Sequence, residues 1–155
     1  MTETAIRTEA PLALKLERVC RAGPETVFEA WTDPARLGVW FGPRGFSVAE
    51  ASLHVRPGGA YRIVMLSPEG NRHVVAGTYT AVERPRHLAF TWGWETTGTR
   101  GHETEVDITL DPHPEGCFLR LRQGNFESDT ALAGHRGGWS ESLHRLVECL
   151  AQTAE

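Results

Sequence analysis

The sequence lacks long apolar runs, clusters of basic residues and closely spaced cysteines. No stretch approaches the roughly 20 apolar residues that span a bilayer, and the first ten residues, MTETAIRTEA, carry no secretion-signal pattern. The 16 basic and 20 acidic residues give a net charge of −4 without a basic patch, which argues against nucleic acid and membranes as partners. We therefore expect a cytoplasmic protein.

Metal-binding, cofactor-binding and nucleophile motifs are also missing. Cys20, Cys117 and Cys149 are far apart and lie in apolar patterns, which predicts buried, reduced thiols rather than a disulfide or zinc framework. The seven histidines show no H-x-x-x-H spacing, so we expect no metal site. Because there is no G-x-S-x-G, P-loop or dinucleotide-binding motif, we assign no catalytic residue and no cofactor.

The length of 155 residues favours one domain, which we place at residues 11–155 after a polar lead-in, 1–10, expected to be disordered. Within the domain, period-2 alternation bounded by glycine and proline turns predicts about seven strands. These strands cover residues 12–21, 46–55, 60–66, 73–82, 87–95, 104–110 and 117–123. Short connections make the strands antiparallel, and charged residues at alternate positions leave one sheet face in water.

Three helices are predicted, two short and one long. Pro24 suits a first helical turn, and Asp33-Pro34 ends that helix and starts a second one at 34–40. The long helix, 127–151, has its apolar residues at helical spacing, namely Leu132, Trp139, Leu143, Leu146, Val147 and Leu150. Within it, Gly134, Gly137 and Gly138 suggest a kink, a close backbone approach or space left empty, since each glycine costs about 1 kcal/mol there.

The order of elements is one strand, two short helices, six strands and one long helix. This order predicts an α+β fold in which a curved antiparallel sheet has one apolar face and the C-terminal helix lies across it. The two short helices would close one end.

Several local motifs resemble the START-like, or helix-grip (SRPBCC), superfamily, and within it the family similar to the C-terminal domain of the heat-shock protein 90 ATPase activator. The resemblance covers about residues 12–151 and depends on AGPETVFEAW at 22–31, WFGP at 40–43, RPGG at 56–59, GTY at 77–79 and His135 before Gly138-Trp139. One departure is Ala22-Gly23-Pro24, where the family usually has alanine-proline.

The resemblance implies a cavity between sheet and long helix that commonly takes an apolar small molecule, in proteins ranging from lipid carriers to aromatase/cyclases. The alternation of residues along the strands and the helical spacing of the long helix direct twelve side chains toward this interior. They are Trp40, Phe46, Tyr61, Met65, His73, Tyr79, Phe90, Trp92, Trp94, His135, Trp139 and Leu143. The set fits two descriptions, an ordinary aromatic core and a ligand pocket with a few polar groups.

Three functional hypotheses follow. The preferred one is binding of a small apolar or aromatic molecule without chemical change. The second is a cyclase-like or hydrolase-like enzyme in which His73 or His135 acts with Tyr61 or Tyr79. The third, regulation of a chaperone ATPase through protein contact, follows from the family resemblance alone. The oligomeric state is not fixed by the sequence, and a homodimer stays open.

Overall fold

The computed structural model describes residues 12–96 and 99–153, and the lead-in at 1–10 lies outside them. The described strands are β2 (Leu12–Cys20), β3 (Ser47–Leu53), β4 (Ala60–Leu66), β5 (Arg72–Glu83), β6 (His87–Thr96), β7 (Thr99–Arg100), β8 (Thr104–His113) and β9 (Gly116–Phe126). The described helices are α1 (Pro24–Thr32), α2 (Pro34–Trp40) and α3 (Asp129–Thr153). This confirms the predicted order of elements.

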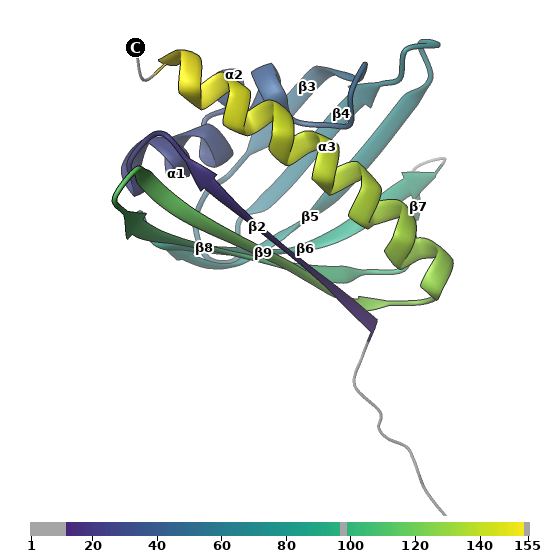
Figure 1. The fold of residues 1–155 in the computed structure, drawn as a ribbon. Helices are drawn as coiled ribbons and strands as arrows, with labels where there is room; N and C mark the ends of the chain where they lie inside the picture. Colours follow the sequence, from purple (N-terminus) through teal and green to yellow (C-terminus); the bar gives the residue numbers. More distant parts are fainter. Residues whose placement is uncertain (1–11, 97–98, 154–155) are drawn as a thin grey trace, which may run out of the picture.

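The strands form one antiparallel sheet in the order β2-β9-β8-β6-β5-β4-β3, and the two-residue β7 pairs with β6. Figure 1 shows the sheet strongly curved, with α3 lying across its concave side. Irregular register between Tyr79 and Ala81 marks a bulge where β5 meets β6. Gly77 is needed nearby, because a Cβ there would overlap the Thr91 carbonyl oxygen.

The two short helices close one end of the curved sheet. Pro24 and Pro34 each occupy the first turn of their helix, where a missing N–H costs no hydrogen bond. The predicted stripe of α1 is buried, with Val27 and Phe28 almost fully covered, and Leu37 and Trp40 of α2 are buried as well. Both proline-based boundaries are confirmed.

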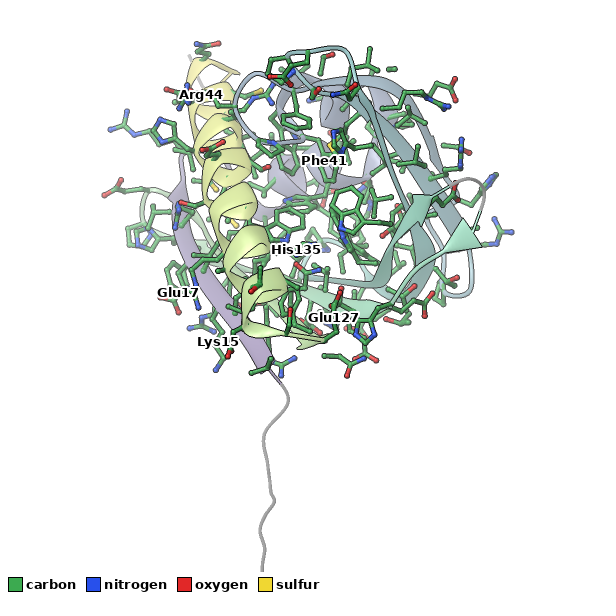
Figure 2. All side chains as sticks on the ribbon, turned by 90° about the vertical axis from the view of Figure 1, so that its right-hand side faces the viewer. Lys15, Glu17, Phe41, Arg44, Glu127 and His135 are labelled. Atoms are coloured by element: carbon green, nitrogen blue, oxygen red, sulfur yellow. The ribbon has the colours of Figure 1, made fainter. Side chains whose placement is uncertain are left out.

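Helix α3 begins after a hydroxyl cap. The backbone N–H of Ala131 donates to Ser128 Oγ at 3.1 Å, as expected for an N-cap serine. Buried side chains then recur on one face at Trp139, Leu143, Leu146 and Leu150. Figure 2 shows His135 directed into the space between α3 and the sheet, while Lys15 and Glu17 on β2 point outward. Helix α3 therefore covers the apolar face of the sheet.

Two of the three cysteines are buried as expected, but they lie next to each other in the sheet, which the sequence did not indicate. Cys20 and Cys117 are fully buried, and burial raises the pKa of the Cys20 thiol to about 12 and that of Cys117 to about 11. They face each other across β2 and β9 although 97 positions separate them, while Cys149 on α3 is only partly buried. The wide spacing in the sequence did not indicate this proximity, because it arises from the pairing of the first described strand, β2, with the last, β9.

The part of the chain that the structure describes contains neither a candidate membrane-spanning helix nor a candidate metal-binding cluster. No helix there is both long enough and apolar enough to cross a membrane. The same residues contain no cluster of three or more histidine, cysteine or acidic side chains able to hold a metal ion.

His87 gives the fold a predicted pH dependence. Its ring nitrogens lie 3.0 Å from Asp107 Oδ2 and 3.0 Å from Glu83 Oε1, and the bond to Asp107 is the main cause that raises the pKa of His87. A raised folded-state pKa means that the pairing stabilises the fold at low pH and is lost as pH rises through that pKa. His87→Gln should therefore lower the free energy of unfolding at about pH 5.5, by at most about 1 kcal/mol, and leave it unchanged near pH 9.

Urea unfolding at both pH values measures this difference. A matched variant that keeps His87 but carries Glu83→Gln and Asp107→Asn should lose the same increment at low pH. A His87→Gln effect that is equal at both pH values would contradict the argument.

Candidate functional site

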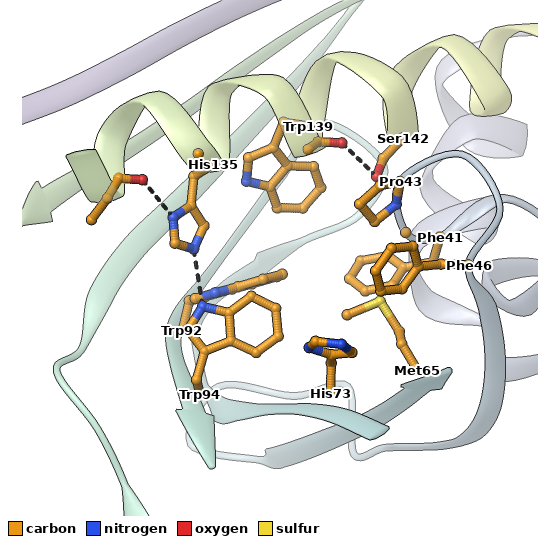
Figure 3. A pocket seen from close by; sticks show the side chains of 14 residues that line it. Phe41, Pro43, Phe46, Met65, His73, Trp92, Trp94, His135, Trp139 and Ser142 are labelled. Atoms are coloured by element: carbon orange, nitrogen blue, oxygen red, sulfur yellow. Dashed lines mark hydrogen bonds between the residues drawn. The ribbon is translucent and has the colours of Figure 1, made fainter. Parts of the chain in front are cut away.

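A cavity of about 330 Å³, called here the main cavity, lies between α3 and the concave face of the sheet. Figure 3 shows rings from β6 and α3 on one side and from the loop after α2 on the other. Its lining consists of Phe41, Gly42, Pro43, Phe46, Met65, His73, Trp92, Trp94, Ala131, Gly134, His135, Gly138, Trp139 and Ser142. None of these is a lysine, arginine, aspartate or glutamate, so the walls are almost entirely apolar.

The Trp139 indole forms the part of the cavity wall that α3 provides. It is buried and lies 5.2 Å from Trp92 and 6.0 Å from Phe41, measured between ring centroids. Its N–H donates to Gln123 Oε1 at 2.7 Å, and Gln123 Nε2 donates to Thr104 Oγ1 at 2.7 Å. This buried chain satisfies every polar atom of a fully covered glutamine and fixes α3 against β9.

His135 connects the two walls. Trp94 Nε1 of β6 donates to His135 Nε2 at 3.2 Å, and His135 Nδ1 lies 2.9 Å from the Ala131 carbonyl oxygen. A carbonyl only accepts, so the proton sits on Nδ1 and Nε2 accepts from the indole. Both ring nitrogens are therefore engaged, and His135 serves here as a neutral cross-link between α3 and β6.

The loop after α2, residues 41–46, forms the opposite wall and is held by α3. Arg145 Nη1 donates to the carbonyl oxygens of Gly42, Pro43 and Phe46 at 2.9, 3.0 and 3.2 Å. Gly42 and Gly45 have φ of +106° and +90°, which suits glycine and lets the loop turn sharply. One guanidinium therefore fixes the segment that carries three apolar lining side chains.

The structure brings seven of the twelve sequence-predicted residues to the main cavity: Phe46, Met65, His73, Trp92, Trp94, His135 and Trp139. The other five do not line it, namely Trp40, Tyr61, Tyr79, Phe90 and Leu143. The tyrosines and Phe90 lie at the closed end, around a void of only about 10 Å³. Trp40 packs against Trp31 of α1, and Leu143 is buried on α3. The twelve residues are thus divided between a solid core at one end and an open cavity at the other.

The two tyrosines are engaged in this solid part. Tyr61 OH donates to the Thr91 carbonyl oxygen at 2.6 Å, and burial raises the pKa of Tyr79. Their rings lie 5.6 Å apart and contact Phe90. Neither hydroxyl reaches the main cavity, so the structure does not bring them together with His73 or His135.

The lining residues that sequence reasoning did not place in the site are Phe41, Gly42, Pro43, Ala131 and Ser142, while the glycines Gly134 and Gly138 were noted only as missing volume. Phe41 follows a helix end and belongs to no periodic pattern, so its direction could not be read. The WFGP motif at 40–43 was a usable signal, because a motif in a loop more often marks a site than a core.

A model of the family described as activator of Hsp90 ATPase homolog 1-like protein matches residues 21–151. A comparison with curated proteins found no match.

Solved structures share the fold. The AHSA1 protein from Silicibacter pomeroyi has 34% identity and a TM-score of 0.84, over 92% of this chain and 99% of its own. A protein from Chromobacterium violaceum has 27% identity and a TM-score of 0.81, over 90% and 98%. The helix-grip fold and the family match cover nearly the same residues. This chain therefore belongs to the family of activator of Hsp90 ATPase homolog 1-like proteins.

Proposed function

We propose that this protein binds a small apolar or aromatic molecule in the main cavity. The observation that carries this proposal is an apolar cavity of about 330 Å³ in a domain whose other end is packed solid. Ligand sites in proteins are typically about 300–1,000 Å³, mostly apolar, with few polar groups. A space of this size that no side chain of the domain occupies gives up packing contacts, which favours a role in binding.

The glycines of α3 support the same proposal. Gly134 and Gly138 line the main cavity, and a Cβ on Gly134 would meet no atom within 4 Å. Each glycine lowers helix stability by about 1 kcal/mol relative to alanine without serving a close backbone contact. Space for a ligand accounts for this cost.

Gly134→Leu should therefore abolish binding, while Gly137→Leu should not. Both positions are open to a larger residue and gain helix propensity, but only Gly134 lines the main cavity. For wild type, an apolar probe such as naphthalene at 100 times its dissociation constant should add about 2.7 kcal/mol of stability. Thermal melting with and without naphthalene measures the shift.

In this comparison, Gly137→Leu should keep the full shift and Gly134→Leu should lose it. Equal shifts in the two variants would contradict a site in the main cavity. Native mass spectrometry of freshly purified protein gives an independent observation, because a retained molecule would appear as added mass.

The geometry of the main cavity gives less support to the two alternative functions, an enzyme and a regulator of a chaperone ATPase. An enzyme using His135 and a tyrosine lacks support, since both His135 nitrogens are engaged and both tyrosines lie outside the main cavity. Regulation of a chaperone ATPase is supported by the family description alone. Stimulation of an Hsp90 ATPase by the purified protein would favour that alternative.

A further inference from the structure

We propose that the ligand is an uncharged molecule of about two fused aromatic rings whose single polar substituent hydrogen-bonds to the His73 imidazole. This inference rests on the proposed function and names the ligand class for the same cavity. Three properties of the main cavity lead to it, namely its size and shape, its lack of charge and the state of its polar atoms.

Size and shape favour a flat bicyclic molecule. An apolar cavity of about 150 Å³ is known to hold benzene, so the main cavity, at about 330 Å³, has room for about two rings. Its walls are themselves flat rings, with Trp94 and Trp92 on β6, Trp139 on α3 and Phe41 on the loop. Aromatic walls favour stacked or edge-on contact with an aromatic ligand over contact with a branched aliphatic one.

The lack of charge selects against ions. None of the 14 lining residues is acidic, lysine or arginine. Arg145, which contacts the loop of this wall, already donates to the carbonyl oxygens of Gly42, Pro43 and Phe46. A ligand carboxylate would therefore lose its hydration without a compensating ion pair, which is costly.

Most polar side-chain atoms of the lining are already used. Trp94 Nε1 donates to His135, His135 Nδ1 donates to Ala131, and Ser142 Oγ donates to the Gly138 carbonyl oxygen at 2.9 Å. Trp92 Nε1 has no partner among the described residues, but it is buried away from the cavity surface. None of these groups offers a free donor to a ligand.

His73 is different. It is exposed, and within residues 12–96 and 99–153 no hydrogen bond to its ring is formed. The ring lies 5.4 Å from Phe46 and 6.5 Å from Trp94, and Figure 3 shows it on the side of the cavity opposite Trp139. A neutral imidazole both donates and accepts, so it can pair with a hydroxyl group. The ligand's rings would lie inside and its substituent at the opening, beside His73.

Three probes of similar size test this at pH 7: naphthalene, 2-naphthol and 2-naphthoate, with binding followed by calorimetry and tryptophan fluorescence. Wild type should bind 2-naphthol about 2- to 10-fold more tightly than naphthalene, the gain expected from one net hydrogen bond. The ionised 2-naphthoate should bind most weakly of the three.

Variants at position 73 test whether the His73 imidazole causes the preference for 2-naphthol over naphthalene. In His73→Leu the ratio of the naphthalene and 2-naphthol dissociation constants should fall to about one, while His73→Gln should keep the wild-type preference because an amide also donates and accepts. His54→Leu is the matched control, since His54 is exposed and does not line the main cavity. Thermal melting without ligand confirms that each variant folds.

The outcomes separate the two proposals. Naphthalene binding with no preference for 2-naphthol, or a preference that survives in His73→Leu, would overturn this inference and leave the proposed function intact. Tightest binding by 2-naphthoate would also overturn it. If none of the three probes binds wild type, the proposed function falls and this inference falls with it.

Discussion

Replacing Trp139 with alanine should lower the free energy of unfolding by about 3–5 kcal/mol, the usual cost of removing a large buried aromatic side chain. Trp139 is 3% exposed and its ring contacts Trp31, Phe41 and Trp92, so both short-helix and sheet side chains lose packing. The substitution also joins the lost volume to the main cavity. Urea unfolding of wild type and variant measures the change.

A second variant separates packing from hydrogen bonding. Trp139→Phe keeps a ring but removes the N–H that donates to Gln123 Oε1, which should cost about 1–3 kcal/mol for the acceptor left unpaired. Gln123→Leu removes the acceptor, and the double variant should cost less than the sum of the two single ones, because the same bond is counted once. Strict additivity would show that the bond contributes nothing.

The fold could be predicted from the sequence because local signals agree along the chain. Pro24 and Pro34 mark helix starts, and the structure begins α1 and α2 at those residues. Strand ends were less accurate: β8 continues to His113 and β9 to Phe126, beyond the predicted 110 and 123. These extensions depend on pairing, since Pro112 and His113 lie opposite Cys117 and Gly116, and pairing partners are not visible in one strand's own pattern.

The site was predicted less completely, for a geometric reason. Alternation along β4 puts Tyr61 and Met65 on the same face, and the structure agrees that both are buried. Their neighbours differ: Met65 pairs with His73 beside the main cavity, whereas Tyr61 pairs with Gly77 near the short helices. Period 2 gives the face of a residue, but its position along the sheet relative to α1, α2 and α3 requires the tertiary fold.

Substituting methionine for Arg145 should lower the free energy of unfolding by about 2–3 kcal/mol, since hydrogen bonds to a charged group are stronger than neutral ones. The guanidinium donates to the Gly42, Pro43 and Phe46 carbonyl oxygens, of which the one on Pro43 also accepts from the Phe46 N–H at 3.0 Å. Methionine keeps most of the side-chain length and packing on α3 but donates nothing. The loss should appear in urea unfolding and as faster amide hydrogen exchange at residue 42 and at residues 44–46.

Two further substitutions test whether the geometry of Arg145 is responsible. Arg145→Lys should recover only part of the stability, because a single ammonium cannot replace both Nη1 on the loop carbonyls and Nη2, which donates to the Val39 carbonyl oxygen at 3.4 Å. Arg136→Met on the same helix should change stability by less than about 0.5 kcal/mol, since Arg136 is exposed. If Arg145→Met resembled Arg136→Met, the loop at 41–46 would be held by its own turns and by the bond from Arg44 N to Glu141 Oε1. The wall of the main cavity would then not depend on α3 through Arg145.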